Sequence, residues 1–167
     1  MFPEPLHPAV VHFPIVFAVL LPISALVALW TIRRGATVRS AWLFPLVLAV
    51  ALTGSSWVAI ETGEAEEDRV EAIVGDAPVH AHEEAAERLL ILSGLVALVA
   101  GVGMLSGPVG SAARLVATVG TVVVLAAGAQ VGSLGGELVY EHGAAAAYSA
   151  PSAVPAWSSE GEGDEGH

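Results

Sequence analysis

The chain contains no cysteine, no lysine and few charged residues of any kind. Without cysteine it has no disulfides, thiolate metal sites or iron–sulfur clusters. Any metal site must therefore use histidine, carboxylate, tyrosine or backbone oxygen. All the basic residues are arginines, six against 17 acidic residues, and the formal net charge is −11. Such an acidic chain repels phosphate, so we expect no nucleic-acid binding.

Charge is scarce because most of the sequence is apolar. Charged residues make up 14% of the 167 residues and hydrophobic residues 54%, whereas about a quarter of a soluble globular domain is charged. The mean hydropathy is +0.70. One soluble core could not bury this much apolar surface, so membrane spans are expected. Only Glu4 is charged before the first apolar run, unlike a standard signal peptide, and we expect that first helix to be kept.

Four apolar runs are long enough to cross a bilayer as helices. They predict an all-α fold, a four-transmembrane-helix bundle that occupies residues 1–145. Polar segments separate the runs, and the longest of these, residues 62–88, is rich in acids. Residues 146–167 are predicted to form a disordered acidic tail. The predicted spans are about 14–32, 41–61, 85–105 and 114–135.

The connecting segments are sorted by charge. The 33–40 and 106–114 loops carry four arginines and no acid, whereas the other side of the membrane would hold all 17 acids. The positive-inside rule then puts the arginine loops in the cytoplasm. Both termini and the acidic loop are predicted to lie on the outer side.

Every histidine falls on this predicted outer side, which suggests a polar site there. His12 and His82, at similar depth, could bind haem iron from opposite faces, and glycines of the fourth span could make room for the macrocycle. Alternatively, the histidines could bind copper or zinc, or only cap helices and form hydrogen bonds. The candidate cofactor ligands are His7, His12, His82 and His142, and the candidate metal ligands are His12, His82 and His142. The candidate partners of these ligands, or of haem propionates, are Glu83, Glu137, Tyr140 and Arg88.

Other chemistry is poorly supported by the sequence. No nucleophile–base arrangement and no phosphate-binding loop stands out, so an enzyme is not expected. Four glycines of the fourth span are separated by multiples of four and predict a stripe for close helix packing. They are Gly120, Gly128, Gly132 and Gly136.

Three motifs resemble a known family. Leu6–Ile15 reads LHPAVVHFPI, the His82-Glu83 pair opens the third span, and Gly135–Gly143 reads GGELVYEHG. Together they resemble the bacterial membrane family called domain of unknown function 2231, over about residues 5–145. The resemblance implies a four-span domain without an established activity. Some relatives are joined to, or encoded beside, cytochrome-c-type domains, which implies a link to haem or electron transfer. It also favours His7, His12, His82 and His142 over His80.

Two hypotheses follow for a multi-pass protein of the bacterial plasma membrane, in contact with the lipid bilayer. The first is a redox-associated subunit whose histidine cluster holds b-type haem or a transition metal, with a cytochrome-c-type redox partner or a second copy of the chain. The second is an accessory subunit without chemistry. A small transporter is less favoured, because the central parts of the spans carry no charged residues.

Overall fold

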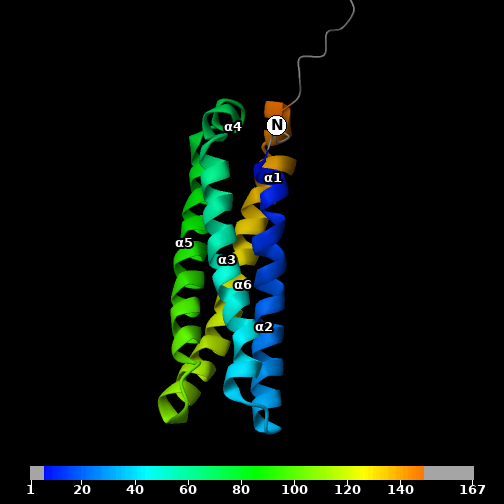
Figure 1. Ribbon diagram of the computed structural model, residues 1–167. Helices are drawn as coiled ribbons and strands as arrows, with labels where there is room; N and C mark the ends of the chain where they lie inside the picture. Colours follow the sequence, from blue (N-terminus) through cyan, green and yellow to red (C-terminus); the bar gives the residue numbers. More distant parts are fainter. Residues whose placement is uncertain (1–5, 149–167) are drawn as a thin grey trace, which may run out of the picture.

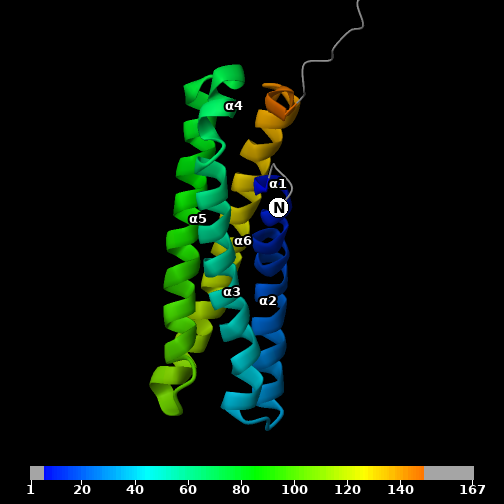
Figure 2. The ribbon, with the colours of Figure 1, turned by 45° about the horizontal axis from the view of Figure 1, so that its top comes forward.

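The computed structural model describes residues 6–148, and all of its regular elements are helices (Figures 1 and 2). Four long helices form a bundle, and three short helices lie at one end of it. The long helices are α2 (His12–Arg33), α3 (Val38–Glu64), α5 (Asp76–Val102) and α6 (Gly107–Tyr140). The short ones are α1 (His7–Val10), α4 (Glu67–Val74) and the 3-10 helix η1 (Ala144–Tyr148).

Each long helix packs against two neighbours, in the cyclic order α2, α3, α5, α6. The first candidate span runs from α1 through α2, and the other three are α3, α5 and α6, each long and apolar enough to cross a membrane. The prediction of an all-α fold with four long apolar helices that could cross a membrane is therefore confirmed, whereas the orientation and the exact boundaries of the spans remain predictions. The first and last described residues lie at the same end of the bundle (Figure 1).

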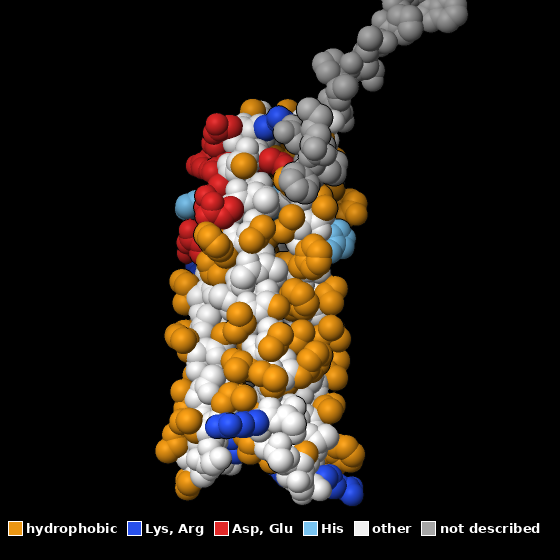
Figure 3. Space-filling model, in the orientation of Figure 1, with side chains coloured by type: hydrophobic (Ala, Val, Ile, Leu, Met, Phe, Trp, Pro, Cys, Tyr) orange, Lys and Arg blue, Asp and Glu red, His pale blue; other side chains and the backbone are white. Residues whose placement is uncertain are grey.

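The interior of the bundle is built largely from small side chains. Ala18, Ala25, Ala49 and Ala117 are almost completely buried, around a few larger residues such as Leu52. Many of the large apolar side chains point outward instead, and on the face seen in Figure 3 they form an apolar band across the middle of the bundle. Helices with small residues at their interfaces approach closely and gain van der Waals contact, the packing expected in lipid.

Charge divides the molecule into two ends, which we call the acidic end and the arginine end (Figure 3). The acidic end comprises α1, α4, η1 and the adjacent ends of α3, α5 and α6. The arginine end comprises the α2–α3 and α5–α6 connections, with Arg33, Arg34, Arg39 and Arg114.

Arg114 is a buried structural residue rather than a loop charge. Its side chain is 6% exposed, and its guanidinium donates hydrogen bonds to the carbonyls of Gly103 and Leu105, just past the end of α5. A cation is favourable there because the helix dipole is negative and the last carbonyls lack helical partners. Trp42 donates to the nearby carbonyl of Ala100 at 2.9 Å.

Some helix ends do not coincide with the predicted span limits. The chain is already helical from His7, ahead of the first predicted span, with Pro8 in the first turn of α1 where no backbone N–H is needed. The helix at the third predicted span begins at Asp76 and ends at Val102. Residues 146–148 of the predicted tail belong to η1, and residues 149–167 lie outside the described residues.

Candidate histidine site at the acidic end

His7 is held where α1 lies against α3. Its Nδ1–H donates to the Ala59 carbonyl at 2.9 Å, and the Thr62 hydroxyl lies 3.5 Å from the same nitrogen. A carbonyl can only accept, so this bond assigns the proton of a neutral ring to Nδ1 and leaves a lone pair on Nε2. Gly63 makes room for the ring, because a Cβ there would lie 3.2 Å from His7 Cε1.

His82 enters the same region from α5 and packs on α6. A Cβ at Gly135 would lie 3.2 Å from His82 Cε1, so this glycine gives the ring its space. The backbone of Val131, one turn earlier on α6, is a hydrogen-bond partner of the ring. The Nδ1 atom of His82 is buried and has no hydrogen-bond partner among residues 6–148.

The two rings form a pair inside the acidic end. Their centroids are 6.3 Å apart and their planes are nearly perpendicular, at 88°. The pair draws on four helices, since α1 and α5 supply the rings while α3 and α6 supply the carbonyls and glycines around them. Each ring has one nitrogen that interacts with a backbone carbonyl. The second nitrogen of each ring can accept a proton or bind a metal ion.

The structure pairs His82 with His7 rather than with His12. His12 is exposed at the start of α2, and His142 is exposed just beyond α6. No group of three or more His, Cys, Asp or Glu residues among those described could hold a metal ion. Among the described residues, the structure therefore does not bring together the predicted set of His12, His82 and His142.

The predicted partner residues either contact residues other than His7 and His82 or are exposed. Glu83 lies 3.8 Å from His80, and Arg88 bonds to Glu84. Glu137 accepts a hydrogen bond from Ser133 at 3.3 Å, and Tyr140 is 88% exposed.

The four glycines of the predicted stripe on α6 differ in their surroundings. Of the glycine stripe, Gly120 packs against Val96 and Gly128 against Ala18, so the space over these glycines is filled by neighbouring side chains. At the other two, Gly132 and Gly136, an added Cβ would meet no neighbouring atom within 4 Å. The glycine that matters for the site is Gly135, which is filled by the His82 ring itself.

Sequence reasoning missed the residues that position the pair. Gly63, Thr62 and the Ala59 carbonyl carry no motif of their own, and only knowledge of which face α3 turns toward α1 would single them out. Glu66 was also missed. Its carboxylate accepts the Leu6 backbone N–H at 3.1 Å, which fixes the residue directly before His7.

Comparison with known proteins adds one finding. No curated protein and no solved structure matches the chain. The family described as predicted membrane protein (DUF2231) matches residues 3–147, nearly the whole of the described region. The chain, with its four apolar helices, therefore belongs to this family of predicted membrane proteins.

Proposed function

We propose that this membrane protein binds one transition-metal ion between His7 and His82. The observation that carries the proposal is the set of contacts that the two ring nitrogens of each histidine make. Each has one nitrogen on a backbone carbonyl, of Ala59 or of Val131, and a second nitrogen free to act as a ligand. Histidines that bind metals nearly always donate their other N–H in this way, which fixes the tautomer and the ring orientation.

The separation of the rings suits a shared ion. Two imidazoles bound to one ion at about 2.0–2.1 Å per bond have centroids roughly 6 Å apart when the ion lies between them. The observed separation is 6.3 Å. Imidazole is a good ligand for copper and zinc. Copper in its monovalent state fits best, because it accepts two nitrogen ligands in line, whereas zinc almost always takes four ligands.

The proposed orientation puts this site on the outer side of the membrane. The arginine end carries no acidic residue in its loops, so the positive-inside rule assigns it to the cytoplasm. The histidine pair, the acidic helix α4 and both ends of the described chain would then face outward.

Metal titration of the purified protein tests the proposal. Copper(I) supplied from a chromogenic chelator should bind at one ion per chain. His7→Ala and His82→Ala should each abolish stoichiometric binding, whereas His80→Ala and His142→Ala, at exposed positions, should leave it unchanged. Absence of stoichiometric binding, or equal loss in the exposed-histidine variants, would overturn the proposal.

A second candidate function is a purely structural role in an accessory subunit. The perpendicular edge contact between the rings favours it, because such contacts stabilise packing without any ligand. In that case His82→Gln would lower thermal stability equally with and without copper. A stabilisation by copper that is present in the unaltered protein and lost in His82→Gln would reject the structural role.

A further inference from the structure

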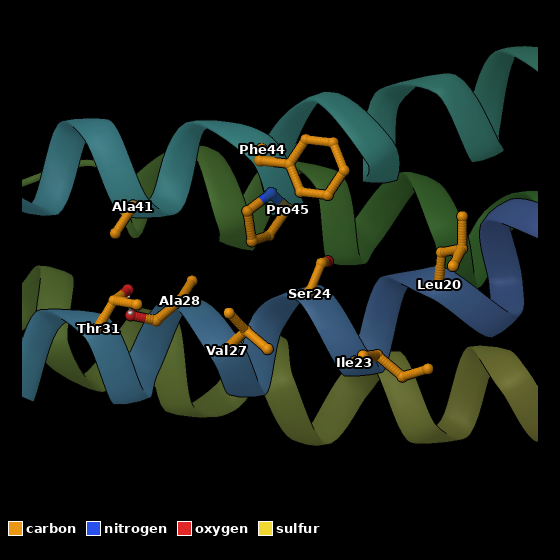
Figure 4. Close-up of a pocket in the computed structure, with 9 residues that line it drawn as sticks. All are labelled: Leu20, Ile23, Ser24, Val27, Ala28, Thr31, Ala41, Phe44 and Pro45. Carbon is orange, nitrogen blue, oxygen red and sulfur yellow. Dashed lines mark hydrogen bonds between the residues drawn. The ribbon is translucent and has the colours of Figure 1, made fainter.

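A groove runs between α2 and α3 near the arginine end, on the outward face of the bundle (Figure 4). Its volume is about 400 Å³. Leu20, Val27 and Thr31 of α2 and Ala41, Phe44 and Pro45 of α3 are among the residues that line it. Several of these side chains, including Val27 and Phe44, are exposed, so the groove belongs to the apolar band rather than to the core.

The lining of the groove has no side-chain hydroxyl that lacks a hydrogen-bond partner. Its two hydroxyl groups, on Ser24 and Thr31, donate to the carbonyls of Leu21 at 2.7 Å and Ala28 at 2.9 Å within their own helix. The remaining lining is hydrocarbon. Since buried hydroxyls that are already satisfied need no further partner, the groove fits a flexible hydrocarbon chain.

Three arginines lie close along the chain to residues that line the groove. Arg33 and Arg34 follow the lining residue Thr31 by two and three residues at the end of α2, and Arg39 precedes the lining residue Ala41 by two residues in the first turn of α3. The guanidinium of Arg34 lies 5.2 Å from the centre of the Trp30 ring, a cation–π contact that holds it at the helix end. Within residues 6–148, none of the three forms an ion pair with a carboxylate.

We propose that this groove is a specific site for an anionic phospholipid, with an acyl chain along α2 and α3 and the headgroup phosphate among Arg33, Arg34 and Arg39. Arginine pairs with phosphate through charge-assisted hydrogen bonds. A second copy of the chain is a poorer occupant. Two copies oriented alike in one membrane would bring their arginine ends together, and these would repel each other.

Lipid competition on the whole protein tests the site. Protein in detergent is exchanged into mixtures of phosphatidylglycerol and phosphatidylcholine, and the lipid retained per chain is counted by native mass spectrometry. We expect one retained phosphatidylglycerol, in clear preference to phosphatidylcholine. Each Arg→Gln change at 33, 34 or 39 should weaken retention about fivefold, the effect of one basic residue near an anionic surface.

Matched variants separate the two halves of the site. Arg69→Gln and Arg88→Gln, at the acidic end, should keep the preference. The double variant Val27→Phe, Thr31→Leu fills the groove and should lose the lipid while the arginines remain. Equal retention of both lipids, displacement by inorganic phosphate alone, or a lipid-free dimer would each overturn the proposal. None of these variants touches His7 or His82, so the result is independent of the metal proposal.

Discussion

Tyr148 donates a hydrogen bond to the carboxylate of Glu66, 82 residues earlier in the chain. The other carboxylate oxygen accepts the backbone N–H of Leu6 at 3.1 Å. The Arg69 guanidinium lies 5.9 Å from the centre of the Tyr148 ring. One carboxylate thus joins the first and the last described segments to the α3–α4 turn, directly beside His7.

The Tyr148–Glu66 contact should be sensitive to strong alkali. Burial, followed by the hydrogen bond to Glu66 and its negative charge, raises the pKa of Tyr148 to about 12. The neutral phenol is favoured in the folded state, so the contact stabilises fully below the ordinary tyrosine pKa of about 10. That stabilisation is lost as the pH rises through about 12. A titration of tyrosinate absorbance should show a late component that disappears in Tyr148→Phe. An unchanged titration in that variant would contradict the assignment.

Removing the charge of Glu66 should loosen both attached segments together. In Glu66→Gln the amide keeps only one accepting oxygen, so Leu6 N–H and the Tyr148 hydroxyl can no longer each donate to an oxygen of their own, and neither contact keeps its charge assistance. We expect faster amide exchange in residues 6–10 and 144–148, with the rest of the bundle unaffected. Glu64→Gln, at an exposed neighbouring position, is the control. Faster exchange in only one of the two segments would show that they are not coupled through this carboxylate.

Two adjacent glycines of α6 should respond differently to alanine. A Cβ at Gly136 has no atom within 4 Å to meet, so Gly136→Ala should stabilise α6 by about 0.5–1 kcal/mol through helix propensity. A Cβ at Gly135 would lie 3.2 Å from the His82 ring. Gly135→Ala should therefore lose that gain and shift the His82 ring. Thermal unfolding of the two variants, with the NMR signals of the histidine rings, measures the difference. Equal stabilisation by both would mean that Gly135 does not position His82.

The buried arginine should matter more than the exposed ones. Arg114→Gln shortens the donor and leaves the carbonyls of Gly103 and Leu105 without their charged partner. Hydrogen bonds to charged groups contribute about 1.5–3 kcal/mol each, so a marked fall in the melting temperature is expected. Arg39→Gln, in the exposed first turn of α3, should cause little change in thermal stability. Similar melting temperatures for both variants would argue against a capping role for Arg114.

Hydropathy and charge were sufficient to predict the four helices and the gathering of histidines at one end. Both depend on the local sequence and on the alternation of sides at each crossing. Which of His7 and His12 faces the inside of the bundle depends on where the first helix begins. Five residues along a helix rotate a side chain by about 140°, so only one of the two could point into the bundle. The sequence pattern did not reveal that the helix begins at His7, and therefore did not reveal which one.

The roles of Gly135 and Gly63 were hidden for a related reason. A glycine stripe at multiples of four was visible in the sequence, but Gly135 lies one position off it. Whether a helical glycine faces a neighbour depends on how the helix is rotated, which the packing of all four helices determines together. Arg114 was hidden because its partners are backbone carbonyls, which leave no trace in the side-chain pattern.

The bundle's small-inside, large-outside packing implies an inverted tolerance to substitution. In a water-soluble protein, surface positions accept most changes while large core residues are sensitive to truncation. Here, positions such as Leu98 should accept any lipid-compatible side chain of whatever size but reject a charge. Buried Ala49 and Ala117 should instead be intolerant of even one added methyl group, because growth there forces two helix axes apart. In saturation mutagenesis of this protein, side-chain volume should decide which substitutions are tolerated at interior positions, and side-chain polarity should decide it at lipid-facing positions.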